Sequence, residues 1–150
     1  MQLSKFSDYS FRILIFAGTK KGVCTTSEIA NAYRISQNHL VKVVHRLESL
    51  GLIATKKGKN GGFRLIEDPS NIRLGGLLRM LEQNMDLVEC FSRNDDHCRI
   101  TESCRLKYIL QRALDEFIGH LDQFTLADLL QPSKPLQKIL LPSLGNELVQ

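Results

Sequence analysis

Apolar residues recur at helical spacing in three successive stretches of the first 51 residues. The first stretch, residues 6–17, predicts a helix that ends at Gly18. Residues 25–28 read Thr-Thr-Ser-Glu, which is a capping box and predicts a short second helix. Ser36 is suited to cap a third helix, and Gly51 is suited to end it. Together the three stretches predict one helix followed by a pair of helices that are joined by a tight turn.

The third predicted helix has one apolar face and one polar face. At 100° per residue, Leu40, Val44 and Leu47 define the buried direction. The opposite side includes two cations and no acid, since it carries Asn38, Lys42, His45, Arg46 and Ser49. Such a helix after a tight turn is typical of a helix-turn-helix, in which the second helix reads DNA. Its candidate DNA contacts are Ser36, Gln37, Asn38, His39, Lys42, His45 and Arg46.

Two short β-rich runs follow the third helix, on either side of a glycine-containing turn. The turn holds Asn60 and Gly61, and Asn-Gly favours positive φ, which predicts a hairpin. A basic hairpin directly after a reading helix is typical of the wing of a winged helix, where cations reach the DNA backbone or minor groove. The candidate DNA contacts in this wing are Lys56, Lys57, Lys59, Asn60 and Arg64.

The second half of the chain predicts more helices. Residues 68–70 read Asp-Pro-Ser and predict a linker, and residues 72–81 predict a fourth helix in spite of its two glycines. A fifth and longest helix is expected from Thr101 to about Phe124. Its apolar stripe is broader than one small domain can cover, so we expect homodimerisation through it, with an internal core helix as the alternative. Thr125 is suited to cap a short last helix.

The predicted fold is therefore mainly α. Residues 1–67 are expected to form a winged helix-turn-helix with a small β-hairpin wing. Residues 68–131 are expected to form a loop and the dimerisation helices, and residues 132–150 a poorly ordered tail. A two-fold dimer would place two reading helices on the half-sites of a pseudo-palindrome.

The composition fits a single cytoplasmic protein with reduced thiols. The chain has 150 residues, 43% of them apolar, and its four cysteines are too few for a secreted disulfide scaffold. No signal-peptide segment opens the sequence, and no apolar run approaches the roughly 18 residues that a membrane span needs. We therefore expect no membrane partner.

The net charge of +4 is distributed unevenly along the chain. Residues 1–66 hold eleven Lys and Arg and three Asp and Glu, a net +8, whereas residues 67–150 hold nine and thirteen, a net −4. A basic front half is consistent with a polyanion-binding surface, and a solvated basic surface is the alternative on charge alone. With the predicted reading helix and wing, this charge favours double-stranded DNA as the partner.

Three of the four cysteines lie within fifteen residues: Cys90, Cys98 and Cys104, with seven and then five residues between them. Residues 88–104 are polar and have no helical or strand period, so they predict a loop, called the cysteine loop below. An odd number of thiols favours a bound metal or cluster over a disulfide. Cys104 is expected in the first turn of the long helix, where the helix dipole favours its thiolate.

A four-coordinate centre held by three thiolates needs one further ligand. The cysteine loop offers Glu89, Asp95, Asp96 and His97. Zinc is an alternative to iron, but the loop lacks the Cys-x2-Cys pair of structural zinc sites, and its wide spacings suit a larger cluster. An enzyme would need a third group to orient Cys98 and His97, and none can be named, so we expect no enzyme. Cys24, outside this loop, is expected to be a small buried residue or a free thiol.

Five segments in combination resemble a bacterial family of winged-helix, iron–sulfur regulators, and within it the nitric-oxide-sensitive repressors. The segments are FSDYSFR (6–12), SQNHLVK (36–42), GKNGGFRL (58–65), CRLK (104–107) and TLADL (125–129). The resemblance implies a homodimer that represses transcription from its operator. Nitric oxide is the implied effector, and its attack on an iron–sulfur cluster would end DNA binding.

The resemblance also implies how the cluster is bound. Its ligands would be Cys90, Cys98 and Cys104, and the cluster would be 4Fe–4S, with 2Fe–2S as the alternative. By its spacing alone Asp8 would only form an exposed ion pair with Arg12, four residues further on. In the nitric-oxide-sensitive branch, however, an acid at this place can complete the coordination from the other subunit, so Asp8 becomes the implied fourth ligand.

Three features of this sequence can be compared with the pattern of the family. The branch that regulates cluster assembly uses a His three residues after the third cysteine, whereas this chain has Lys107, which favours the nitric-oxide branch over a regulator of iron supply or redox state. Seven residues separate the first two cysteines, where many relatives have five. The wing has Lys57 where relatives usually have Arg, which keeps the charge but loses the planar fork.

Overall fold

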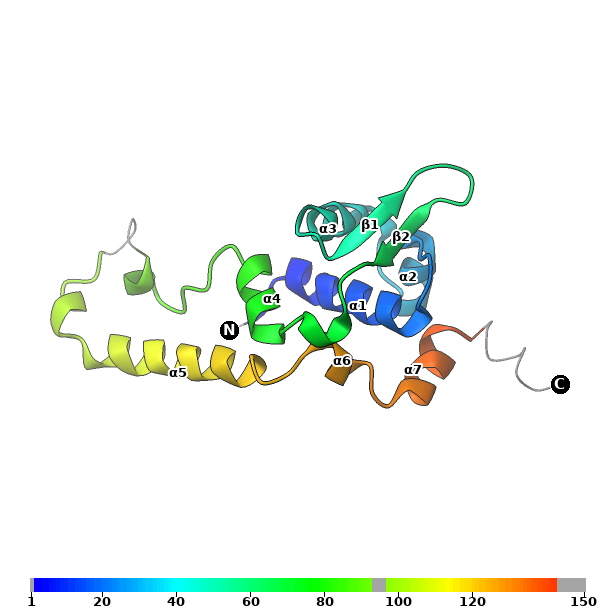
Figure 1. Cartoon of the computed structure of the whole chain (residues 1–150). Helices are drawn as coiled ribbons and strands as arrows, with labels where there is room; N and C mark the ends of the chain where they lie inside the picture. The colour runs from blue at the N-terminus through cyan, green and yellow to red at the C-terminus, as the bar shows by residue number, and fades with distance from the viewer. Residues whose placement is uncertain (1, 93–96, 143–150) are drawn as a thin grey trace.

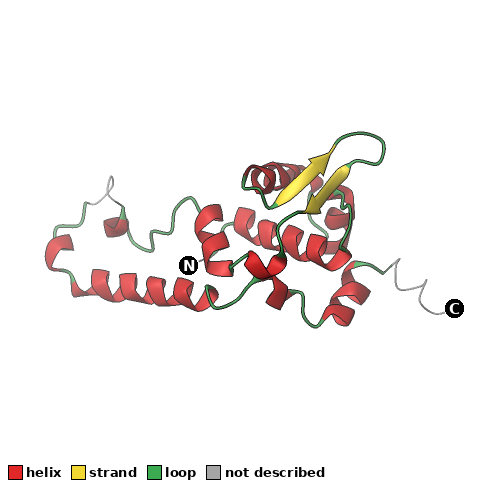
Figure 2. Ribbon diagram, in the orientation of Figure 1, coloured by secondary structure: helices red, strands yellow, loops and turns green. Residues whose placement is uncertain are grey.

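The computed structural model describes residues 2–92 and 97–142. It confirms a mainly helical chain with one two-stranded hairpin (Figures 1 and 2). In chain order the elements are α1 (Lys5–Lys20), α2 (Thr26–Tyr33), α3 (Gln37–Ser49), β1 (Ile53–Lys56), β2 (Gly62–Leu65), the 3-10 turn η1 (Pro69–Asn71), α4 (Leu74–Leu81), the 3-10 turns η2 (Glu89–Phe91) and η3 (Thr101–Ser103), α5 (Arg105–Leu121), α6 (Leu126–Leu129) and α7 (Ser133–Leu140).

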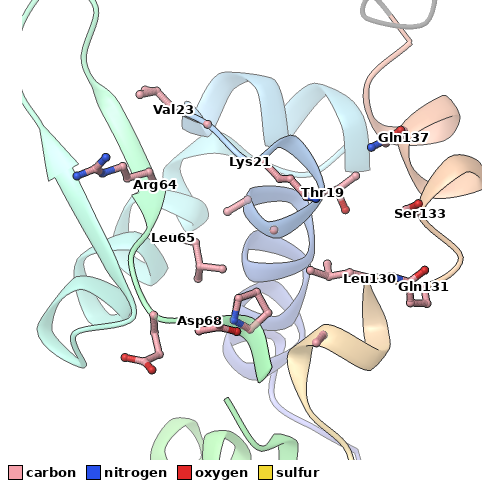
Figure 3. Close-up of a pocket in the computed structure, with 16 residues that line it drawn as sticks. Thr19, Lys21, Val23, Arg64, Leu65, Asp68, Leu130, Gln131, Ser133 and Gln137 are labelled. Atoms are coloured by element: carbon pink, nitrogen blue, oxygen red, sulfur yellow. The ribbon is translucent and has the colours of Figure 1, made fainter. Parts of the chain in front are cut away.

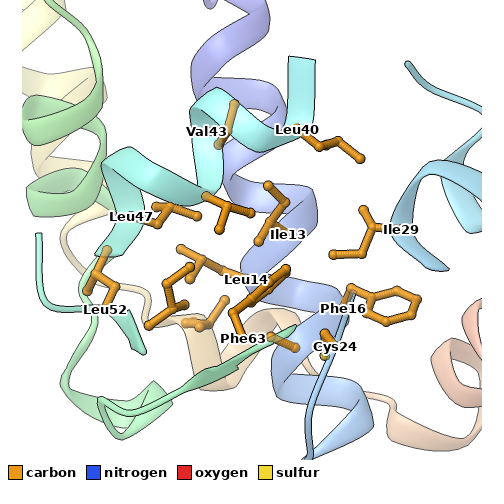
Figure 4. Packing of buried hydrophobic residues seen from close by; sticks show 14 of the residues in the cluster. Ile13, Leu14, Phe16, Cys24, Ile29, Leu40, Val43, Leu47, Leu52 and Phe63 are labelled. Atoms are coloured by element: carbon orange, nitrogen blue, oxygen red, sulfur yellow. The ribbon is translucent and has the colours of Figure 1, made fainter. Parts of the chain in front are cut away.

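The core of the winged helix lies between α1, α2, α3 and the hairpin (Figure 4). Its central side chains are almost fully buried: Ile13, Leu14 and Phe16 from α1, Ile29 from α2, and Leu40, Val43 and Leu47 from α3. The apolar periodicity of the sequence therefore identified the inner face of each helix. The start of α2 also follows its sequence, since the side chains of Thr25 and Glu28 form the predicted capping box.

The hairpin pairs β1 with β2 in antiparallel register, from Ile53 opposite Leu65 to Lys56 opposite Gly62. The glycines of its turn act differently from the sequence prediction. Positive φ occurs at Gly58 (+109°) and Gly62 (+159°) and not at the Asn-Gly pair. Gly61 is required by close approach instead, because a Cβ there would lie 2.5 Å from the carbonyl oxygen of Lys56.

The first helix runs past the residue that was predicted to end it. Gly18 is buried inside α1, which ends only where Lys21 adopts the left-handed conformation and donates its N–H to the carbonyl of Ala17. A Cβ on Gly18 would lie 2.7 Å from Leu130, next to α6. The prediction failed because this glycine serves a contact that is distant in the sequence and does not stop the helix.

Helices α4 to α6 attach the second half of the chain to α1. The residues around Arg73 and Thr125 form a backbone bridge: Leu74 N–H donates to Phe124 O (3.0 Å), and Leu126 N–H donates to Ile72 O (2.8 Å). The predicted linker at residues 68–70 is ordered, since it forms η1 and packs against α6.

The segment expected to be a poorly ordered tail contains a helix. Residues Ser133–Leu140 form α7, which packs on α1 and α2 and buries Leu140 and Leu141. Pro135 is accommodated because it lies in the first turn, where a backbone N–H has no partner in the helix. Residues 143–150 lie outside the described part of the chain. Among the described residues, no helix has both the length and the apolar character needed to cross a membrane.

Candidate nucleic-acid interface and cysteine loop

The polar face of α3 is exposed, as its sequence predicts. Asn38, Lys42 and His45 are all exposed, and in the described part of the chain no hydrogen bond holds their side chains. Ser36 caps α3 with extended backbone but makes no side-chain cap hydrogen bond, and the first turn contains no acid. The first N–H groups of the helix therefore remain available to an anion such as a DNA phosphate.

Three other predicted contact residues of α3, in contrast, have partners within the chain. Gln37 Nε2 donates to Thr26 Oγ1 at the start of α2 (3.0 Å). The His39 ring lies edge-on to Tyr9 of α1, with 6.5 Å between the ring centroids, and Arg46 Nη2 donates to Met80 O of α4 (3.4 Å). These contacts fix α3 against its neighbours, and the contacts of Gln37, His39 and Arg46 with DNA remain predictions.

The wing extends the basic surface of α3. All five of its predicted contact residues are exposed: Lys56, Lys57, Lys59, Asn60 and Arg64. Residues 29–66 contain seven Lys and Arg and a single acid, Glu48. A surface with this charge attracts the phosphate backbone through release of its counterions.

Replacing Lys42 with alanine is expected to weaken operator binding at low salt and to reduce the slope of log affinity against log salt by about 0.9, the value of one lost phosphate contact. The measurement is fluorescence anisotropy over a salt series, on a duplex selected from a random pool by the wild-type protein. Lys134→Ala removes an equally exposed charge from α7 and serves as the control. An unchanged slope for Lys42→Ala would remove Lys42 from the interface.

One cavity lies away from both α3 and the cysteine loop. It has a volume of about 660 Å³ and lies between the end of α1, the exit from β2 and the α6–α7 segment (Figure 3). Leu65, Pro69 and Leu130 contribute apolar lining, and Arg64 is a predicted DNA-contact residue on its rim. None of the predicted cluster ligands lines it.

The three clustered cysteines are half-buried, and they form no disulfide within the described part of the chain. Cys90 lies in η2, and Cys98 accepts a backbone hydrogen bond from Thr101 at the start of η3. Residues 101–103 form η3, so α5 begins later than predicted. Cys104 is therefore the N-cap of α5 and does not lie in its first turn. Two of the fourth-ligand candidates, Asp95 and Asp96, lie outside the described residues.

Asp8 lies in the first turn of α1 and is held by Arg12. Arg12 Nε lies 3.1 Å from Asp8 Oδ1 and Nη2 lies 2.8 Å from Oδ2, while the guanidinium also lies over the rings of Tyr9 and Tyr33. Among the described residues, no group of three or more His, Cys, Asp and Glu side chains is close enough to hold a metal ion. The described part of one chain therefore brings neither the three cysteines nor Asp8 and the cysteines together into a metal site, and the whole ligand set stays a prediction.

Cys24 is separate from this site, as its sequence position predicts. It is fully buried beneath the wing, where its backbone pairs with Phe63. Burial is the main reason why the pKa of its thiol rises to about 11. The buried thiol therefore favours its neutral form at neutral pH, which agrees with the expected small buried residue.

Most of α5 has no packing partner among residues 2–92 and 97–142. Leu106, Tyr108 and Ile109 are 58%, 65% and 60% exposed, and Ile118 near its end is buried. Figure 1 shows α5 extending away from the winged helix toward the cysteine loop. So large an apolar surface on one helix is typical of a protein–protein interface.

The fold and its exposed basic face define a winged-helix DNA-binding protein. Residues 3–132 match the sequence pattern of one family, Rrf2, which is described as iron-dependent transcriptional regulators. The chain belongs to this Rrf2 family and is therefore a transcriptional regulator that acts on DNA. Its relatives are named as regulators and not as enzymes, in agreement with the sequence analysis.

Individual relatives support the same assignment. The chain is 42% identical over 142 residues to the HTH-type transcriptional regulator NsrR of Shouchella clausii, covering 93% of this chain and 95% of the relative. It is 39% identical to NsrR of Bacillus subtilis over the same length, covering 93% and 97%.

Solved structures show the same fold. The cysteine regulator CymR of B. subtilis superposes with a TM-score of 0.67 at 27% identity, covering 86% of this chain and 95% of that one. IscR of T. potens superposes with a TM-score of 0.69 at 22% identity, covering 91% of each chain.

Proposed function

We propose that this chain is a repressor that senses nitric oxide through an iron–sulfur cluster. One observation carries the proposal: three cysteines lie on the segment that leads into a long helix with an exposed apolar face, and the other end of that helix packs against α4 beside a basic winged helix. The names of the NsrR relatives and the iron-dependent description of the family agree with it.

The chemistry of the described donors, rather than their spacing in one chain, fits such a cluster. Iron–sulfur clusters are held by thiolates, and Cys90, Cys98 and Cys104 are half-buried and form no disulfide among the described residues. Cys104 caps a 17-residue helix that has no acid in its first turn, so this residue lies at the positive end of the helix dipole. When bound, the cluster would be 4Fe–4S, with 2Fe–2S as the alternative, and would supply iron at which nitric oxide can bind.

Asp8 of the partner subunit is the proposed fourth ligand. Within one chain the Asp8 carboxylate is engaged on both oxygens by Arg12, so ligation requires that this ion pair be shared or released. Arg12 also contacts Tyr9 and Tyr33, which links the carboxylate to α2. A ligand taken from α1 of the other subunit would tie each cysteine loop to the opposite DNA-binding unit.

The other end of α5 is the proposed route from the cysteine loop to DNA. Arg79 of α4 donates from both Nη atoms to the carboxylate of Asp122, at 3.2 and 2.5 Å, and Arg73 Nη1 donates to the Asp122 carbonyl at 2.9 Å. The guanidinium of Arg79 is the main reason why the pKa of Asp122 is lowered, so the pair stays charged at neutral pH. A displacement of Cys104 is therefore carried along α5 to α4, and so to the spacing of the two α3 helices in a homodimer.

Nitric oxide is expected to lower operator affinity at least tenfold, which corresponds to a coupling free energy of about 1.4 kcal/mol. The protein is purified without oxygen, and its affinity for the selected duplex is measured before and after addition of a nitric oxide donor. Equal affinity in both states would contradict the proposed switch and leave the DNA-binding assignment intact.

An iron-supply sensor is the second candidate, and the iron-dependent description of the family favours it. The two functions predict different responses of the same preparation. An iron-supply sensor would lose operator affinity when an iron chelator removes the cluster. Nitric oxide would lower its operator affinity no more than the chelator does. A colourless preparation that contains zinc would exclude both.

A further inference from the structure

Glu48 is the single acid in the basic stretch of residues 29–66, and it connects α3 to the wing. Its Oε1 accepts hydrogen bonds from the backbone N–H of Thr55, at 3.2 Å, and from the Thr55 hydroxyl. Thr55 lies in β1, so one carboxylate joins the last turns of α3 to the first strand of the hairpin.

The hairpin register explains why the Thr55 N–H is available to Glu48. Thr55 lies opposite Phe63, whose own N–H and carbonyl are both used on the other edge of β2, in bonds of 2.8 and 2.7 Å to Cys24. Thr55 and Phe63 therefore form a non-hydrogen-bonded pair, and the Thr55 N–H points away from β2. An exposed strand edge of this kind needs a partner, and Glu48 supplies it.

The wing is consequently held on both edges. Cys24 holds β2 against the segment before α2, and Glu48 holds β1 against α3. The Thr55 hydroxyl is the main reason why the pKa of Glu48 is lowered, with smaller contributions from the backbone N–H of Thr55 and the positive charge of Lys57. The carboxylate is therefore ionised at neutral pH, although it sits in a surface that is otherwise suited to phosphate.

We infer that Glu48 is a positioning residue for DNA binding, which fixes the wing relative to α3 so that both reach one duplex. The inference rests on the proposed DNA interface. An acid in this surface repels phosphate and lowers affinity for any sequence. Its benefit is geometric: cations on a wing of fixed position contact the backbone in one register, which favours the operator over other DNA.

The experiment compares Glu48→Ala with Glu48→Gln, which retains the oxygen that accepts from Thr55 but removes the charge. Affinity is measured for the selected duplex and for a scrambled duplex, and hydroxyl-radical footprints report the wing and α3 separately. For Glu48→Ala we expect loss of the wing footprint, retention of the α3 footprint, and about a tenfold lower preference for the selected duplex. For Glu48→Gln we expect both footprints and the wild-type preference, with tighter binding to both duplexes.

Two further variants make the test specific. Thr55→Val removes the hydroxyl alone, so it should weaken the preference for the selected duplex less than Glu48→Ala does. In the double variant, Thr55→Val should cause no loss of preference beyond that of Glu48→Ala. Glu67→Ala removes an exposed acid just after β2. The Glu67 carboxylate accepts a hydrogen bond from the Asn71 side chain (2.9 Å) and not from the wing, so this variant should leave both footprints unchanged.

The outcomes separate this inference from the DNA-binding proposal. A wild-type protein that selects no duplex would overturn both. A wild-type protein that binds, with an intact wing footprint in Glu48→Ala, would overturn the positioning role alone. Equal loss of both footprints in Glu48→Ala and Glu48→Gln would also overturn it, since Glu48 would then serve only folding.

Discussion

Alanine at Cys90, Cys98 or Cys104 is expected to abolish the bound cluster and, with it, the response of operator binding to nitric oxide. Each substitution removes one of three thiolates, and the described part of the loop offers no spare cysteine. Cluster content is measured by visible absorbance and by iron and sulfide analysis of protein purified without oxygen. Retention of a full cluster by any of the three variants would remove that cysteine from the ligand set.

Cys24→Ala is the matched control for the cysteine variants. Cys24 is fully buried under the wing and belongs to the hydrophobic core, so its replacement should cost stability through a small cavity and leave the cluster in place. Asp8→Ala is expected to fall between these cases, with a bound but more labile cluster, because three thiolates remain. A cluster of unchanged spectrum and stability in Asp8→Ala would refute the assignment of Asp8 as the fourth ligand.

Gly75→Ala is expected to destabilise the protein by about 1–3 kcal/mol, the usual effect of overpacking. A Cβ at Gly75 would lie 2.3 Å from Asp122 Oδ1 and 2.6 Å from the Ile118 carbonyl oxygen. These atoms belong to the contact between α4 and the end of α5, so the substitution should also reduce operator binding. Thermal unfolding and anisotropy measure the two effects.

The adjacent glycine provides a control in the same helix. A Cβ at Gly76 would meet nothing within 4 Å, so Gly76→Ala should gain up to about 0.8–1 kcal/mol from helix propensity alone. The two variants therefore change stability in opposite directions, although the sequence change is identical. If both variants were equally stable, the close packing of α4 on α5 would be wrong.

The sequence was sufficient for features that depend on neighbouring residues. The inner face of α3 follows from the spacing of Leu40, Val44 and Leu47, and the start of α2 follows from a capping box. The hairpin follows from two β-rich runs around a glycine-containing turn. In each case the signal and its effect lie within one or two turns of the chain.

The failures arose where distant residues decide the local structure. Gly18 has the sequence signal of a helix end, but its missing side chain accommodates Leu130. The prolines of residues 132–150 indicate poor order, but burial of Leu140 and Leu141 against the winged helix stabilises α7. For Asp8 the spacing alone predicted the ion pair with Arg12, which the structure confirms, whereas its proposed role as a ligand rests on a resemblance and stays a prediction.

The bridge between Arg73 and Thr125 has a consequence for how this protein can evolve. Residues 82–121 leave the winged helix at the end of α4 and return beside it, where the ion pair of Arg79 and Asp122 and the bridge close the base. The segment of residues 82–121, which contains all three clustered cysteines, therefore begins and ends at adjacent places in the fold. Under the proposed function, mutations within it would exchange one chemical signal for another while the DNA-reading surface, which is built from other parts of the chain, keeps its sequence preference.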